Sequence, residues 1–190
     1  MKKARIDCSA KSYDAIYRGS RKYRLPYRES PYYPLWAASL KYISGKVIEL
    51  GCGTGQFAQM FKDNLDLSYT GVDFSKEAIR QAQSRNPSMK FIRDDVFSVK
   101  ISSFDTIIAF EVLEHLGDDL KLLKYLERKH KIVFSVPDYL SKNHYRCFRT
   151  QDEIYSYYQS LDIHTIEEFK LTRNKFGVLN TLFLVYGSKR

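Results

Sequence analysis

Short apolar runs alternate with stretches of helical periodicity over the first 150 residues of the chain. The apolar runs lie near residues 46–50, 68–73, 89–93, 104–110 and 131–136. They are short and rich in β-branched residues, as expected of buried strands. Helical patterns fill the stretches between them, near residues 55–64, 75–86 and 117–129. This alternation predicts an α/β domain with a mostly parallel twisted sheet and helices on both faces.

The pattern differs at the two ends of this region. Before the first strand, Pro34 suits the first turn of a helix with three apolar residues on one face, Trp36, Leu40 and Ile43. Beyond residue 150, a helical stretch near 151–160 precedes two β-rich runs, 163–171 and 179–186, which residues 174–177 connect. The two runs predict a C-terminal antiparallel hairpin that completes the sheet.

Length and composition favour one domain. A chain of 190 residues with 44% hydrophobic residues fills one core, and no linker rich in Pro, Gly or Ser divides it. We therefore expect a single domain, with an N-terminal segment over residues 1–45 and an α/β core over 46–190. No apolar run is long enough to span a membrane, no signal-peptide stretch follows the first residues, and the three cysteines form no disulfide or metal pattern. These features predict a cytoplasmic protein.

A glycine-dense turn follows the first predicted strand. Gly51, Gly53 and Gly55 stand directly after residues 47–50 and before a helical stretch. An open α/β sheet uses such a turn to form a nucleoside-binding crevice at the carboxyl end of its first strand. Glycine allows a ligand to touch the main chain there.

Two carboxylates indicate which ligand this crevice binds. Asp73 ends the second predicted strand, near the spacing at which such sheets bind ribose hydroxyls through an acid. Glu49 lies two residues before the turn, where it would repel a pyrophosphate and attract an ammonium group. The position three residues beyond Gly53 is Gln56 rather than the glycine of a dinucleotide site. A ligand with a ribose, a cationic amino-acid part and no phosphate fits this set, and S-adenosyl-L-methionine is such a ligand.

At these motifs the chain resembles the class I S-adenosylmethionine-dependent methyltransferases, over residues 31–190. Four motifs occur in the family's order, at residues 47–57, 69–75, 91–97 and 104–116, and they are similar to those of the ubiquinone-pathway O-methyltransferases. The resemblance implies the Rossmann-like class I methyltransferase fold and S-adenosyl-L-methionine as the methyl donor.

The resemblance also implies roles for individual residues. Glu49 and Gly51 would hold the methionine part, Asp73 the ribose hydroxyls, and Asp95 with the amide of Val96 the adenine edge. The remaining positions expected at the cofactor are Gly53, Gly55, Phe57, Phe74, Asp94, Phe110 and Glu111.

Nearly all of the net charge of +9 lies before the α/β core. Residues 1–48 carry 11 basic and three acidic residues, together with seven of the 15 tyrosines. A solvated arm is one interpretation, although such arms are usually poor in aromatic residues. Tyrosines interleaved with arginines suit stacking on rings and pairing with anions. We therefore expect residues 18–33 to form a lid that recognises an anionic or aromatic acceptor.

Candidate catalytic residues cluster after the fourth predicted strand. Glu114 and His115 follow Glu111 there, and His144 lies in the loop after the fifth strand. We predict His115, His144 and Glu114 as catalytic, with a histidine as general base, and assign no metal ligand. Two alternatives stay open. The cluster resembles the divalent-cation site of small-RNA 3′-terminal 2′-O-methyltransferases, in which a metal activates the acceptor oxygen, or these residues only stabilise the local turn.

Three classes of function follow from these features. The first is a methyltransferase that acts on an oxygen or nitrogen of a small, anionic, sugar-like or aromatic metabolite. The second is an RNA 2′-O-methyltransferase that uses the basic N-terminal segment, with a binding affinity that falls steeply with salt. The third is a catalytically silent binding module, which the intact set of candidate cofactor residues disfavours. The sequence specifies neither the acceptor nor the oligomeric state.

Overall fold

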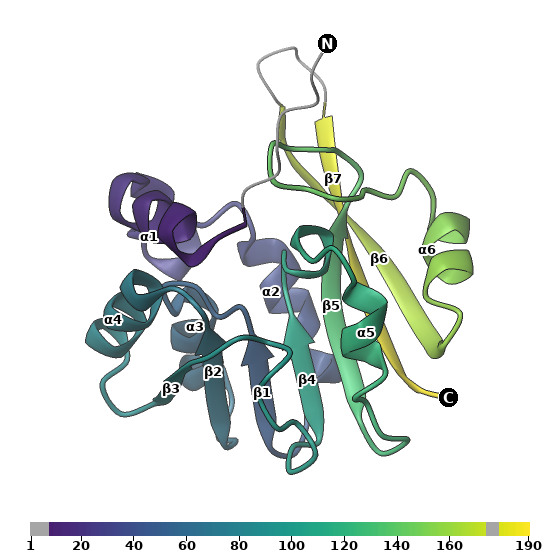
Figure 1. Ribbon diagram of the computed structural model, residues 1–190, viewed down its shortest axis with the longest axis horizontal. Helices are drawn as coiled ribbons and strands as arrows, with labels where there is room; N and C mark the ends of the chain where they lie inside the picture. The colour runs from purple at the N-terminus through teal and green to yellow at the C-terminus, as the bar shows by residue number, and fades with distance from the viewer. Residues whose placement is uncertain (1–7, 174–178) are drawn as a thin grey trace.

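Seven strands form one twisted sheet in the computed structural model, which describes residues 8–173 and 179–190 (Figure 1). The strands are β1 Val47–Leu50, β2 Tyr69–Asp73, β3 Lys90–Arg93, β4 Thr106–Ala109, β5 Lys131–Pro137, β6 Leu161–Arg173 and β7 Leu179–Lys189. Their order is β3-β2-β1-β4-β5-β7-β6. Strands β1 to β5 pair in parallel, whereas β7 is antiparallel to both β5 and β6. The predicted mostly parallel sheet with an antiparallel C-terminal pair is confirmed; the predicted connection at 174–177 lies outside the described residues.

Helices flank the sheet and cross its upper edge. They are α1 Ala10–Gly19, α2 Tyr33–Ser39, α3 Gln56–Asn64, α4 Lys76–Arg85, α5 Asp119–Leu123 and α6 Gln151–Tyr157. Short 3-10 turns occupy Arg21–Tyr23, Tyr27–Glu29, Leu40–Tyr42 and Leu113–His115. Ser75 caps α4, since its hydroxyl accepts the amide hydrogen of Ala78 at 3.1 Å. Among the helices of the described residues, none has the length and apolar character needed to cross a membrane.

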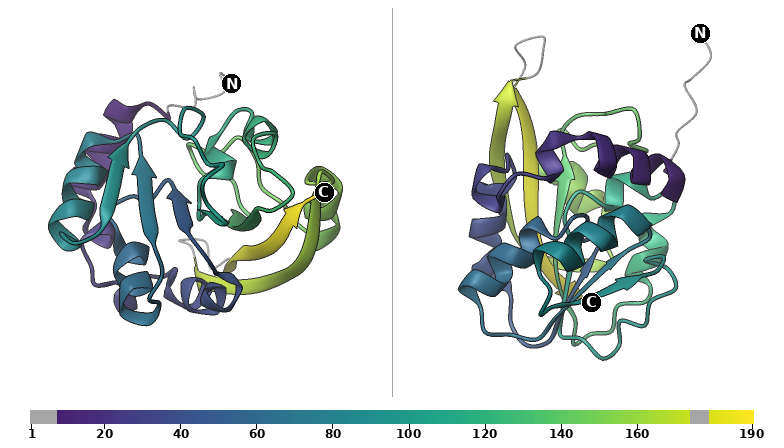
Figure 2. Two further views of the ribbon diagram at one scale, coloured as in Figure 1. Left: turned by 90° about the horizontal axis from the view of Figure 1, so that it is seen from below. Right: turned by 90° about the vertical axis from the view of Figure 1, so that its left-hand side faces the viewer.

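Each face of the sheet carries its own apolar core. Adjacent residues of a strand point to opposite faces, so Ile107 and Ile108 of β4 belong to different cores. On one face the core includes residues of α2 and α3, among them Trp36 and Phe61. On the other face it includes residues of α5 and α6, among them Leu122. Figure 2 shows the two layers of helices on either side of the strands.

The helix predicted over residues 117–129 is much shorter in the structure. Asp118 caps α5 by accepting the amide of Lys121, but the helix ends at Leu123. Turns follow, and the Nδ1 atom of His130 accepts the amide hydrogen of Glu127 at 2.8 Å. This side-chain contact satisfies a main-chain donor outside a helix.

Helix α1 was not predicted from the sequence as a helix. Ser9 caps it by accepting the amide of Ser12, and Tyr13 and Tyr17 lie one turn apart on its inward side. The helix lies beside α4, near the carboxyl ends of the parallel strands (Figures 1 and 2). The chain from α1 to α2 thereby covers the edge of the sheet at which the predicted motifs end.

Candidate functional site

The turn after β1 is shaped by glycines with a left-handed main chain. Gly51 has φ of 71° and Gly53 has φ of 51°, a region that residues with a side chain rarely adopt. A Cβ on Gly51 would also collide with the side chain of Val112, which follows β4. The turn therefore brings bare main chain to the boundary between β1 and β4.

Asp73 ties this turn to the end of β2. One carboxylate oxygen accepts the amide hydrogen of Gly53 at 3.0 Å, and the other accepts that of Ser75 at 2.8 Å. The residue is only 2% exposed, and this burial raises its pKa to about 6, although both hydrogen bonds oppose the shift. Each oxygen has a further lone pair for a ligand hydroxyl.

Glu49 is buried within β1 beneath the turn. It is 3% exposed and accepts a hydrogen bond from the hydroxyl of Tyr69 on β2. Burial raises the pKa of Glu49 to about 8, because the charged form loses its hydration, while the hydrogen bond from Tyr69 partly offsets this. Burial thus favours the neutral carboxyl group, and an approaching cation would favour its ionised form.

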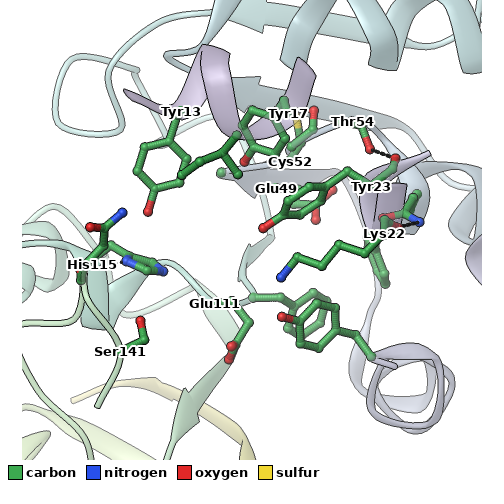
Figure 3. A pocket seen from close by; sticks show the side chains of 18 of the residues that line it. Tyr13, Tyr17, Lys22, Tyr23, Glu49, Cys52, Thr54, Glu111, His115 and Ser141 are labelled. Atoms are coloured by element: carbon green, nitrogen blue, oxygen red, sulfur yellow. Dashed lines mark hydrogen bonds between the residues drawn. The ribbon is translucent and has the colours of Figure 1, made fainter. Parts of the chain in front are cut away.

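Two adjoining cavities open at the carboxyl ends of the strands. The larger, of about 450 Å³, lies among the N-terminal residues, the turn after β1 and the loop after β5 (Figure 3). The smaller, of about 140 Å³, reaches toward the ends of β2 and β3. Five residues line both cavities: Tyr13, Tyr17, Gly51, Glu111 and His115. These shared walls make the two cavities parts of one cleft.

Most of the predicted site residues line this cleft. The larger cavity is lined by Glu49, Gly51, Gly53, Phe57, Phe110, Glu111, His115 and His144. The smaller is lined by Asp73, Phe74, Asp95 and Val96, besides residues shared with the larger. Three predicted residues line neither cavity. Gly55 precedes α3, Asp94 accepts the amide hydrogen of Asp95 through its side chain, and Glu114 is buried behind the wall of the larger cavity.

Residues 10–33, here called the N-terminal cover, lie over the turn after β1. The side chain of Tyr17 lies against Gly53, and nearby Asp14 of α1 accepts hydrogen bonds from the Ser75 hydroxyl and, at 3.0 Å, from the amide of Glu77. Gln81 of α4 donates to the carbonyl of Tyr17 at 3.1 Å. Helix α1 is thus fastened to the N-terminal half of α4.

The rest of the cover is held through its main-chain carbonyls. The Gln56 amide donates to the carbonyls of Lys22 and Leu25, at 3.1 Å and 2.8 Å. The Thr54 hydroxyl donates to the carbonyl of Tyr23 at 2.7 Å, and Arg85 donates to the same carbonyl at 3.2 Å. The donors come from the glycine turn, α3 and α4, so the predicted cofactor motif and the neighbouring helix α4 together hold the cover.

Tyrosines and arginines of the N-terminal cover differ in what they face. Four tyrosines line the larger cavity or are buried beside it: Tyr13, Tyr17, Tyr23 and Tyr32. The arginines of the cover are all exposed: Arg18, Arg21, Arg24 and Arg28. Among the cover's basic side chains, Lys22 alone lines the larger cavity of the described structure, with its ammonium group 4.7 Å from the centre of the Tyr23 ring. The aromatic part of the predicted lid therefore faces the site, and its arginines face solvent.

Two histidines meet at the far wall of the larger cavity. The Nδ1 atom of His115 donates to the carbonyl of Asn143 at 2.9 Å, and that of His144 donates to the carbonyl of Tyr139 at 3.1 Å. These carbonyls set the tautomer of each ring and leave both Nε2 atoms without a proton. The ring centres are 4.7 Å apart, and burial lowers the pKa of His115 to about 4.

Glu114 lies behind these rings without a hydrogen bond. It is 0% exposed, and neither carboxylate oxygen has a partner among the described residues; the Nε2 atom of His115 is 3.7 Å from one oxygen. Burial raises the pKa of Glu114 well above its ordinary value. Possible ligand atoms of Glu114, His115 and His144 lie within 4.8 Å of one another, which is a spacing that would suit one metal ion.

Glu111 has an unusual main chain at the end of β4. Its φ is 56°, a left-handed value that costs a residue with a side chain about 1–3 kcal/mol. The Ser135 hydroxyl of β5 accepts the amide hydrogen of Glu111 at 2.8 Å and donates to its Oε1 atom at 3.0 Å. Burial raises the pKa of Glu111 to about 7, and Lys22 opposes the shift.

Arg146 joins the two segments that carry the histidines. From the loop after β5, it donates to the carbonyls of Leu113 and Leu116 at 2.7 Å and 2.8 Å. It also pairs with the buried carboxylate of Asp119 at 3.1 Å. The turn with Glu114 and His115 is thereby tied to the loop with His144.

Several lining residues were not identified from the sequence, among them Trp36, Cys52, Thr54, Gln56 and Tyr139. Thr54 and Gln56 belong to the glycine turn and its helix, so their proximity to the site could have been inferred. Nothing in the sequence pattern indicated that Trp36 or Tyr139, besides packing in a core, would also line the cavity.

Residues 26–168 match a family model described as a methyltransferase domain. Among characterised proteins, trans-aconitate 2-methyltransferase of Rhodopseudomonas palustris is 37% identical over 84 residues, which are 43% of this chain and 33% of that enzyme. An uncharacterized protein of Methanocaldococcus jannaschii is 30% identical over 98 residues, or 50% of this chain and 45% of that protein. The matches therefore span less than half the length of these relatives.

The fold is shared with solved structures. A SAM-dependent methyltransferase from Anabaena variabilis superposes with a TM-score of 0.71 over 100% of this chain and 98% of that one, at 14% identity. Another, from Mesorhizobium loti, gives a TM-score of 0.65 over 86% and 100%, at 17% identity. At these identities the likeness concerns the fold.

Proposed function

This chain belongs to the class I S-adenosylmethionine-dependent methyltransferases, and from that membership we propose that it methylates an oxygen or nitrogen of a small anionic or aromatic metabolite. The observation that carries the proposal is the single cleft in which a nucleoside-sized end and an acceptor-sized end share the walls Gly51, Glu111 and His115. A donor bound along the glycine turn would expose its reactive end at that shared wall. We also propose one domain, in which the segment before residue 46 covers an α/β core over 46–190.

The donor set of the cleft fits S-adenosyl-L-methionine. We assign the ribose hydroxyls to Asp73, whose two oxygens keep free lone pairs, and the adenine to Asp95 and the amide of Val96 in the smaller cavity. Glu49 and Gly51 would hold the methionine part, since a buried carboxyl group can ionise beside an ammonium group. Asp94 takes no part in this proposal, because it lines neither of the two cavities.

The acceptor would occupy the larger cavity. Rings of Tyr23, Tyr32 and Tyr139 line it, and Lys22 and Lys142 supply positive charge, a combination that suits an aromatic or anionic metabolite. The similarity to trans-aconitate 2-methyltransferase gives further, weaker support for an acceptor that carries a carboxylate.

Bound S-adenosyl-L-methionine supplies an electrophilic methyl group on a positively charged sulfur. Little covalent chemistry is then required of the protein, and alignment of the acceptor can supply much of the acceleration. The N-terminal cover would exclude water from the cleft, since it lies over the glycine turn and is fastened by the seven side-chain hydrogen bonds described above. His115 and His144 would border the acceptor from the opposite wall.

The proposal is tested by calorimetric titration with S-adenosylhomocysteine, with and without added magnesium or zinc. We expect binding with a Kd in the micromolar range, equivalent to about 8 kcal/mol, and no dependence on metal. The absence of any binding would overturn the assignment of the donor, and with it the proposed function.

A second candidate is a metal-assisted RNA 2′-O-methyltransferase. It is favoured by the cluster of Glu114, His115 and His144 and by the outward-facing arginines of the N-terminal cover. These three side chains would hold a divalent cation, and such a metal would lower the pKa of a ribose hydroxyl. Titration with zinc or manganese, compared between the wild type and Glu114→Ala, tests the metal. Binding of a short RNA at several salt concentrations tests the substrate. For an RNA substrate, log Kd would rise linearly with the logarithm of the salt concentration, with a slope of about 0.7 for each phosphate contacted.

A further inference from the structure

Glu111 occupies the boundary between the two ends of the cleft. It lines both cavities, together with Gly51 and His115, and it follows β4 directly, at the centre of the sheet. If the donor lies along the glycine turn, the transferred methyl group leaves from this boundary. The carboxylate of Glu111 therefore lies at the point where the acceptor nucleophile would meet the methyl group.

The structure holds this carboxylate in one position. The left-handed main chain of Glu111 is retained despite its cost, and Ser135 bonds both the amide and the Oε1 atom. Among the described residues no hydrogen bond reaches the other oxygen, Oε2. Lys22, which extends its ammonium group into the same cavity (Figure 3), is the charged group that counters it.

We propose that Oε2 of Glu111 receives the proton of the acceptor nucleophile, so that the methylated group is a hydroxyl or an amine and not a carboxylate. This inference rests on the proposed methyl transfer. A carboxylate acceptor carries no proton to remove, and its charge would be repelled by Glu111 at the point of reaction. An anionic group elsewhere on the acceptor can still pair with Lys22 or Lys142.

The step balances without a further reactant. The lone pair of the acceptor forms the bond to the methyl carbon, and the bond between that carbon and the donor sulfur breaks with its electrons left on sulfur. The proton of the hydroxyl or amine passes to Glu111, which releases it to solvent when the product leaves.

The histidines are less suited to this role. His115 has its free Nε2 atom toward the buried Glu114, at 3.7 Å from the carboxylate oxygen. His144 is buried, and its ring packs against those of His115 and Tyr139.

The experiment compares the wild type with Glu111→Gln, Glu111→Asp and a matched control, Glu127→Gln, whose side chain is exposed and far along the chain. Each protein is incubated with methyl-labelled S-adenosyl-L-methionine and a pool of hydroxy acids, phenols, amines and trans-aconitate. The labelled product is then treated with mild alkali, which releases methanol from methyl esters but leaves ethers and methylamines intact. Binding of S-adenosylhomocysteine by each variant is measured by calorimetry.

We expect an alkali-stable product, whose formation falls about 100-fold or more in Glu111→Gln, is partly restored in Glu111→Asp, and is unchanged in the control. The Kd for S-adenosylhomocysteine should stay within about three-fold of the wild type, or ~0.7 kcal/mol. An alkali-labile product, or an alkali-stable product formed equally fast by Glu111→Gln, would overturn the inference. Failure of the wild type to bind S-adenosylhomocysteine would instead overturn the proposed function.

Discussion

The hydroxyl of Tyr17 lies 3.4 Å from the position that a Cβ atom would take on Gly53. A residue of the first helix thus closes over the glycine turn of the first strand, although 36 positions separate the two in the chain. The same tyrosine contributes to the walls of both cavities. The ring therefore stands between solvent and the segment to which we assign the donor.

Removal of the Tyr17 ring should open a path between solvent and the segment assigned to the donor. We expect Tyr17→Ala to raise the dissociation rate of S-adenosylhomocysteine by about ten-fold, equivalent to ~1.4 kcal/mol, because a closed cover slows ligand release. Stopped-flow competition measures this rate. Tyr125→Ala serves as the control, since that ring is 46% exposed and away from the cleft. Equal rates in the wild type and Tyr17→Ala would show that the ligand leaves by another route.

Asp73 should contribute both to the affinity for S-adenosylhomocysteine and to the stability of the fold. We expect Asp73→Ala to weaken binding of S-adenosylhomocysteine about ten-fold or more, and to destabilise the protein by ~1–3 kcal/mol, because the amides of Gly53 and Ser75 lose their acceptor. Calorimetry and thermal unfolding measure the two effects, with the exposed Asp66→Ala as control. An unchanged Kd in Asp73→Ala would remove Asp73 from the ribose site.

Glu49 should make stability depend on pH. Its pKa is about 8 in the folded protein and near its ordinary value of 4.5 in the unfolded chain. The folded state therefore binds this proton more tightly than the unfolded chain does. The resulting contribution to the free energy of unfolding is fully present below about pH 4.5 and is lost as the pH rises through 8. Glu49→Gln keeps a neutral acceptor for Tyr69 at every pH. We expect the Tm of this variant, relative to the wild type, to rise by about 3 °C or more between pH 5 and 8.5. Parallel curves of Tm against pH would contradict the buried, protonated carboxyl group.

Arg146 should position the histidine-bearing segments without touching the donor. We expect Arg146→Ala to destabilise the protein by about 3 kcal/mol, since it leaves the buried Asp119 without its cation. It should lower the turnover of any acceptor, yet leave the Kd for S-adenosylhomocysteine unchanged. The exposed Arg149→Ala is the matched control. A loss of S-adenosylhomocysteine binding in folded Arg146→Ala would mean that Arg146 also supports the donor site.

The strands and the glycine turn could be predicted because their signals are local. A buried strand needs only a short apolar run, and the turn needs glycine wherever φ is positive, as at Gly51 and Gly53. The confirmed fold class, a mostly parallel sheet with an antiparallel C-terminal pair, followed from the alternation of strands and helices and from the family resemblance; the order of the strands was not predicted. The predicted helix after residue 117 was too long, because the imidazole of His130 competes for a main-chain donor.

The docking of the N-terminal cover could not be predicted in the same way. Most of its attachments are made to main-chain carbonyls, which every residue possesses: those of Tyr17, Lys22, Tyr23 and Leu25. The carboxylate of Asp14 makes the others. The charge pattern suggested that arginines would recognise the acceptor, but in the described structure no arginine of the cover lines either cavity, whereas Lys22 lines the larger one. The roles of individual residues at the donor and the acceptor stay predictions.

Attachment through main-chain carbonyls allows the side chains of the cover to vary while the cover stays in place. The side chains that donate these hydrogen bonds to the cover belong to the α/β core: Thr54, Gln56, Gln81 and Arg85. Side chains at positions such as 22, 23 and 32 can then be substituted without removing these hydrogen bonds. These three positions line the larger cavity, so we expect a library that varies them alone to change which acceptors the proposed site takes.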